Sequence, residues 1–163
     1  MSLIFLTGDK KSGKTSWLGS KFIHKTDADG VISPDIGGIR FFQFLKSGMY
    51  LPFSRPAAGV DSISIGMYTF SKQSFEIAAR HATSALLTNT WTIIDEWGPL
   101  ELDRQGFYPL LFEPLQTAAT DNDRRVIIVV RPLLLEPVLD SFELRNEEVT
   151  IWTFPEIHSF DIH

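Results

Sequence analysis

The sequence predicts an α/β fold in which helices cover a mostly parallel central sheet. Two observations lead to this prediction. Apolar, strand-like runs alternate with stretches of helical periodicity, and a glycine-rich segment joins the first run to the first helical stretch. The 163 residues suit one domain, 1–163, whose core needs no disulfide or metal.

The first apolar run, Leu3-Ile4-Phe5-Leu6, leads into a phosphate-binding loop with the pattern G-x-x-x-x-G-K-S/T. Glycine is needed where a Cβ would keep backbone N–H groups away from phosphate oxygens. Lys14 is expected to bind the β- and γ-phosphates, and the Thr15 hydroxyl to bind Mg²⁺. The expected nucleotide-binding residues are Gly8, Asp9, Lys10, Lys11, Ser12, Gly13, Lys14, Thr15 and Ser16. This strand-loop-helix unit predicts a P-loop NTPase three-layer sandwich, the alternative being a glycine turn without a ligand.

The elements that follow in the first half are predicted from apolar spacing and from turn residues. Helical spacing ends where Asp-Ala-Asp-Gly interrupts it at 27–30. Lys-Ser-Gly at 46–48 separates two apolar runs and indicates an inserted β-hairpin. The predicted elements are a helix over Lys14–Lys25, a short strand over Val31–Ser33, a hairpin of Ile39–Leu45 with Met49–Phe53, and a strand near Ser62–Ile65.

In the second half, Ser71 is a typical N-cap for a helix that reaches about Leu87, and its small apolar residues favour close packing on a sheet. Pro109 suits the first turn of a later helix, whereas Pro114 is expected to bend it. The continuous β-branched run at 126–130 is typical of a central parallel strand. The predicted elements are strands over Trp91–Ile94, Val126–Val130 and Val149–Phe154, and helices over Phe107–Ala119 and Pro132–Phe142.

The strand Trp91–Ile94 ends in Asp95-Glu96, the form of a Walker B element. Asp95 is expected to hold Mg²⁺, and Glu96 to polarise the attacking water as a catalytic residue beside Lys14. The alternative is a surface acid pair at a strand end. P-loop proteins with such an acid pair imply, by resemblance, an additional strand between the P-loop strand and the Walker B strand. Val126–Val130 is the candidate for it, which would bring Arg131 near the γ-phosphate as a third catalytic residue, or leave it as an ordinary strand-end arginine.

Three segments together resemble the THEP1-like nucleoside triphosphatases. They are the P-loop, Gly37-Gly38-Ile39-Arg40 with Phe41-Phe42, and Asp95-Glu96-Trp97-Gly98-Pro99-Leu100-Glu101-Leu102. The chain departs from the family pattern at Pro99, where a lysine is usual, at Phe42, where a glycine is usual, and before Gly13, where Pro-Gly is missing. The resemblance implies hydrolysis of nucleoside triphosphates.

The same resemblance makes three further residues candidates for a function. Arg40 would lie near the phosphates and Glu101 would brace the loop after Glu96, although a salt-bridged or solvated surface role is open for both. Trp97 would either cover the nucleotide or anchor that loop, with an anchor favoured.

Composition excludes several classes of function. The formal net charge of −5 gives no basic footprint, so neither nucleic acid nor an anionic membrane is an expected partner. The chain has no cysteine, its four histidines are too scattered for a local metal motif, and no apolar run approaches the ~20 residues of a membrane span. We expect a cytoplasmic protein that binds a nucleoside triphosphate of the ATP or GTP class with Mg²⁺ as cofactor.

Two alternatives to a triphosphatase stay open, a small-molecule or nucleoside kinase and a nucleotide-gated binding module. Aromatic and aliphatic residues near the C-terminus are expected either to wrap the domain or to join a homo-oligomer. They are Trp152, Phe154, Ile157, Phe160 and Ile162.

Overall fold

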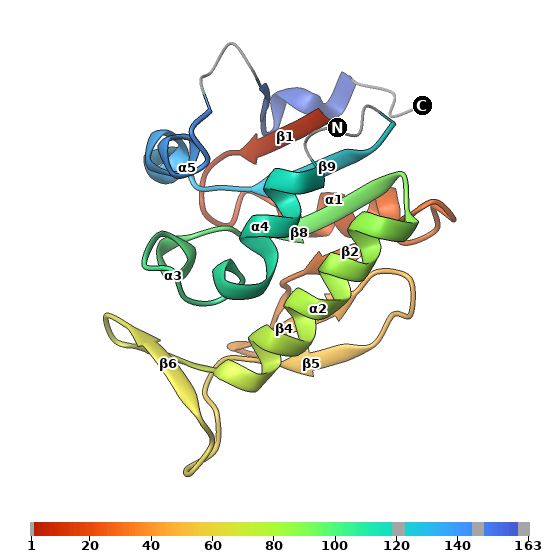
Figure 1. Ribbon diagram of the computed structural model, residues 1–163. Helices are drawn as coiled ribbons and strands as arrows, with labels where there is room; N and C mark the ends of the chain where they lie inside the picture. Colours follow the sequence, from red (N-terminus) through yellow and green to blue (C-terminus); the bar gives the residue numbers. More distant parts are fainter. Residues whose placement is uncertain (1, 119–122, 145–148, 160–163) are drawn as a thin grey trace.

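The computed structural model describes residues 2–118, 123–144 and 149–159, and a mixed α/β arrangement accounts for them (Figure 1). Its main sheet has the strand order β10-β1-β9-β8-β2-β4-β3, with β5 paired to β4. The five strands from β10 to β2 are parallel, and β4 joins β2 in the antiparallel sense. The strands are β1 (Ser2–Thr7), β2 (Ala28–Ile32), β3 (Asp35–Ile36), β4 (Ile39–Phe44), β5 (Tyr50–Pro52), β8 (Trp91–Asp95), β9 (Arg125–Val129) and β10 (Thr150–Thr153).

Helices cover both faces of this sheet and so make three layers. One core packs α2, α4 and α5 against the sheet, and the other packs α1 and the 3-10 helix η3 against the opposite face. Figure 1 shows α2 and α4 on the near face of the sheet and α1 behind it. The helices are α1 (Lys14–Phe22), α2 (Lys72–Thr88), α3 (Pro99–Leu102), α4 (Tyr108–Ala118), η1 (Pro132–Leu134), α5 (Leu135–Ser141) and η3 (Glu156–Ser159).

The strand order confirms the topology expected from the acid pair. Strand β9 lies between the P-loop strand β1 and the strand β8 that ends in Asp95. The hairpin is confirmed as β4 and β5, and the Ser71 hydroxyl caps α2 by accepting from the N–H of Ser74. Arg125 starts β9 at the amino edge of the sheet, where its guanidinium lies over the ring of Trp91.

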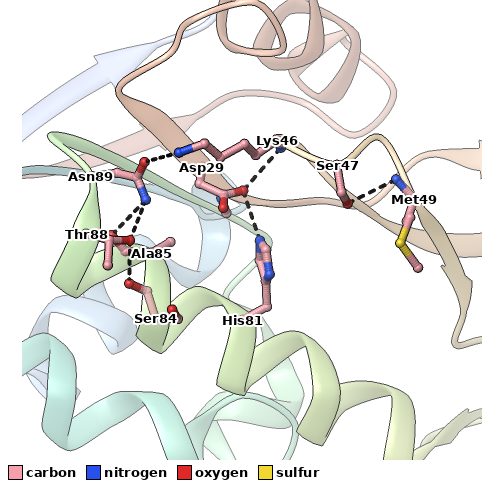
Figure 2. A network of polar contacts seen from close by, with 10 residues as sticks. Asp29, Lys46, Ser47, Met49, His81, Ser84, Ala85, Thr88 and Asn89 are labelled. Atoms are coloured by element: carbon pink, nitrogen blue, oxygen red, sulfur yellow. Dashed lines mark hydrogen bonds and ion pairs between the residues drawn. The ribbon is translucent and has the colours of Figure 1, made fainter.

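The start of β2 corrects the predicted strand over Val31–Ser33, because the strand already begins at Ala28. The Asp-Ala-Asp-Gly segment was expected to be irregular, yet Asp29 is buried in the strand and accepts from His81 and from the N–H of Lys46 (Figure 2). A Cβ at Gly30 would lie 2.1 Å from the carbonyl oxygen of Ile93, so close pairing with β8 requires glycine there. Because its carboxylate is hydrogen-bonded, the polar residue Asp29 can lie buried in a central strand.

Several short elements differ from the predictions. The predicted helix over Pro132–Phe142 is divided into η1 and α5. Pro114 lies inside α4, and a bend there stays a prediction. Strand β3, helix α3 and the strand β7 (Tyr68–Ser71), which pairs with β6 (Ser62–Ile65) in a separate hairpin, were not predicted. Ala119, Phe160 and Ile162 lie outside the described residues. Within the described ranges, no helix combines the length and the apolar character that a membrane span requires.

Candidate active site

The loop between β1 and α1 has the backbone geometry that a phosphate cradle requires. Gly8 and Gly13 have φ angles of 149° and 102°, in the region that favours glycine. A Cβ at Gly8 would lie 2.9 Å from the carbonyl oxygen of Phe154, so the neighbouring chain also excludes a side chain there. Asp9, Lys10, Lys11 and Ser16 are exposed around the loop, at the carboxyl edge of the sheet.

The Lys14 ammonium folds back over this loop. Its Nζ donates to the carbonyl oxygens of Gly8 and Asp9, each at 2.6 Å, and to the Ser12 hydroxyl at 3.2 Å. Burial lowers the pKa of Lys14, and the negative charges of Asp95 and Glu96 oppose that shift. The ammonium therefore lies where an anion in the loop would meet it.

Thr15 and Asp95 meet although 80 positions separate them in the sequence. The Thr15 hydroxyl donates to Oδ2 of Asp95 at 2.6 Å, which joins the start of α1 to the end of β8. Asp95 is only 2% exposed. Burial raises the pKa of its carboxyl group, and hydrogen bonds from Thr15 and Ser33 oppose that rise.

The oxygen atoms of Thr15 and Asp95 are suitable ligands for Mg²⁺. A hydroxyl and a carboxylate are hard oxygen ligands, and Mg²⁺ commonly takes only one or two protein ligands, completing its shell with phosphate and water. The residues that the structure describes contain no group of three or more His, Cys, Asp or Glu side chains able to hold a metal. A site for Mg²⁺ at Thr15 and Asp95 therefore needs the phosphates of a nucleotide as further ligands.

Glu96 and Arg131 form an ion pair at the same edge. Nη2 of Arg131 lies 2.8 Å from Oε1 of Glu96, and the two side chains are 38% and 21% exposed. Arg131 follows β9, so the central position of that strand brings the guanidinium to the carboxyl edge as expected. Its positive charge is also close enough to Lys14 to lower the pKa of that ammonium.

Ser33 is a residue that the sequence reasoning missed. Its N–H donates to Oδ2 of Asp95 at 3.1 Å and its hydroxyl donates to the Asp95 carbonyl oxygen at 2.7 Å. Arg40 in turn donates to the Ser33 hydroxyl at 3.3 Å and lies over the ring of Phe53. The available signal was a polar residue directly after an apolar strand, but its partner became visible only through the pairing of β2 with β8.

Glu101 and Trp97 hold the loop that follows Glu96. The buried Glu101 carboxylate accepts from the N–H groups of Gly98 at 2.8 Å and Phe107 at 3.0 Å, the contacts of a brace. Burial raises the pKa of Glu101 to about 7. Trp97 is 0% exposed and packs on Phe142, as expected of an anchor for this loop.

Comparison with known proteins identifies the fold. No protein-family model matches the sequence, and neither does any curated protein. The structure aligns with the crystal structure of THEP1 from the hyperthermophile Aquifex aeolicus at a TM-score of 0.64 and 20% sequence identity, over 96% of this chain and 92% of that chain. The chain has a THEP1-like fold. Because the alignment covers 96% of this chain, the likeness in fold runs through nearly all of it.

Proposed function

We propose that this protein binds a nucleoside triphosphate with Mg²⁺ and hydrolyses it to a diphosphate and phosphate. The observation that carries the proposal is the 2.6 Å contact between the Thr15 hydroxyl and the Asp95 carboxylate, whose negative charge also acts on the Lys14 ammonium. A glycine turn without a ligand would not require contact with a buried carboxylate from a distant strand. A P-loop needs this pairing, because the metal and the phosphates bind side by side.

The loop residues divide the work of binding. The loop N–H groups and the start of α1 receive phosphate oxygens, and Lys14 exchanges the carbonyl oxygens of Gly8 and Asp9 for the β- and γ-oxygens. Thr15 and Asp95 hold Mg²⁺, which when bound neutralises charge on the phosphates. Ser33 orients Asp95 through two hydrogen bonds, one from its N–H to the carboxylate and one from its hydroxyl to the backbone carbonyl oxygen.

Glu96 and Arg131 are assigned to the hydrolytic step. Glu96 orients the attacking water and accepts its proton, since water is a poor nucleophile until a base assists it. Arg131 stabilises the charge that develops on the transferred phosphoryl oxygens. Both roles require the ion pair between them to open, so we expect the γ-phosphate to draw the guanidinium away from Glu96.

Single-turnover phosphate release tests the proposal. Excess protein is mixed with ATP or GTP, with Mg²⁺ or with EDTA, and with or without nucleosides and nucleoside monophosphates as acceptors. Mg²⁺-dependent release of inorganic phosphate without an acceptor supports a triphosphatase. Transfer only to an acceptor would indicate a kinase instead, and tight binding without turnover would indicate a nucleotide-gated module.

A further inference from the structure

A second pocket lies away from the P-loop, beside the first turns of α2. It has a volume of about 430 Å³, within the range of small-molecule sites. Its walls come from β6, from α2, from the connection between α3 and α4 and from the first turn of α4. Figure 1 shows α3 and the β6 hairpin on either side of the amino-terminal end of α2.

The charged groups on these walls favour an anion. Lys72 is balanced by Asp61 at 3.6 Å, and both side chains are so exposed that this pair is weak. Arg80 on α2 and Arg104 on the opposite wall also line the pocket, and neither forms an ion pair with an acid among the described residues. Glu76 is the one remaining acidic group on the walls that the structure describes.

The base of the pocket is apolar. The nearly buried ring of Phe75 lines it together with Ile63, Pro109 and Leu110. Guanidinium groups recognise phosphate and carboxylate oxygens through paired N–H donors, whereas such an apolar base suits a flat organic group. We propose that this pocket binds a small organic phosphomonoester, with the phosphate between Arg80 and Arg104 and the organic part against Phe75.

The pocket is connected to the candidate active site through one buried carboxylate. Gly106 lines the pocket, and a Cβ there would lie 2.2 Å from Oε1 of Glu101. Glu101 also accepts from the N–H groups of Phe107 and, on the other side, Gly98, two residues after Glu96. A ligand that moves the 104–106 wall therefore acts on the loop that carries Glu96.

Nuclear magnetic resonance of the whole chain tests this site with adenosine 5′-monophosphate as the probe and adenosine as its uncharged control. The spectra are recorded with Mg²⁺ and a non-hydrolysable triphosphate analogue, and again in the Lys14→Ala variant. We expect saturable shifts of amide signals at 62–63, 72–80, 104–108 and 110, with a further shift of the Gly98 amide. Amide shifts that persist in Lys14→Ala come from this pocket and not from the P-loop. The result therefore tests the pocket independently of the proposed hydrolysis.

Charge reversal supplies the decisive comparison. Arg80→Glu and Arg104→Glu should each weaken monophosphate binding at least ~10-fold, the size expected for a lost charge-assisted hydrogen bond. Lys21→Glu makes the same charge change on an exposed position of α1 and should leave the affinity unchanged. Equal losses in all three variants, equal binding of adenosine, or shifts confined to other residues would overturn the proposal.

Discussion

Asp95→Asn should make the protein more stable while it weakens the Mg²⁺-dependent function. Both hydrogen bonds to the Asp95 carboxylate, from the Thr15 hydroxyl and the Ser33 N–H, end on the same oxygen, Oδ2. An asparagine amide oxygen can replace Oδ2 and keep both bonds. The substitution therefore removes a buried negative charge with little change in the hydrogen bonds.

The sign of the stability change follows from the pKa. Because burial raises the pKa of Asp95 in the folded state, the fold disfavours the ionised carboxylate. This penalty is absent below the unfolded-state pKa, grows between the two pKa values and is fully present above the raised folded-state value. Single stabilising substitutions commonly contribute about 0.5–2 kcal/mol, and we expect a gain of that size near pH 7 that shrinks in acid.

Urea unfolding of the metal-free protein between pH 4 and pH 7 measures this gain, and calorimetry with a non-hydrolysable triphosphate measures binding with and without Mg²⁺. The variant should unfold at higher urea at pH 7 and lose the Mg²⁺-dependent part of nucleotide affinity. A variant that is less stable at pH 7 would refute the argument about buried charge. Undiminished dependence on Mg²⁺ would remove Asp95 from the metal site.

Four further outcomes are expected. Lys14→Ala should lose at least ~10-fold in triphosphate affinity by calorimetry, and near-normal binding would reject the P-loop assignment. Glu96→Gln should keep Mg²⁺-nucleotide binding but hydrolyse ~10²-fold or more slowly, and an unchanged rate would move the catalytic role elsewhere. Arg131→Ala should lower kcat by up to ~10³-fold while diphosphate affinity changes little; equal losses in both would mean that the arginine only binds. Burial alone would raise the pKa of Asp29, but hydrogen bonds, chiefly from His81, outweigh it and lower the pKa, so its contribution to stability is lost as the pH falls below about 4. The acid limb of urea stability against pH should therefore be flatter in Asp29→Asn, and identical limbs would contradict this.

Local patterns were sufficient for the elements that frame the site. The P-loop pattern predicted the turn from β1 into α1, and apolar spacing with the Ser71 cap predicted α2. The position of β9 came from the acid pair at 95–96, because that arrangement implies a strand between β1 and β8. Each of these predictions depends on residues that are neighbours in the sequence or on one topological rule.

Contacts between distant segments were not predictable in the same way. Ser33 reaches Asp95 across 62 positions, and only the parallel register of β2 and β8 brings them together. The strand position of Asp29 depends on His81, which arrives from α2, 52 positions later. Helix α3 has only four residues, too few for helical periodicity to appear.

At the two edges of the sheet, the pKa shifts of buried charged groups have opposite effects: one edge favours the charged form and the other disfavours it. At the amino edge, Asp29 is satisfied by His81 and by the N–H of Lys46, and its pKa is lowered (Figure 2). At the carboxyl edge, burial shifts the pKa of Lys14 and of Asp95 toward their neutral forms, so both charges there are held at a cost to stability. A Mg²⁺-triphosphate bound as proposed would bring an anion to the lysine and a cation to the aspartate in one event. On that proposal, binding would offset the unfavourable environment of both charges.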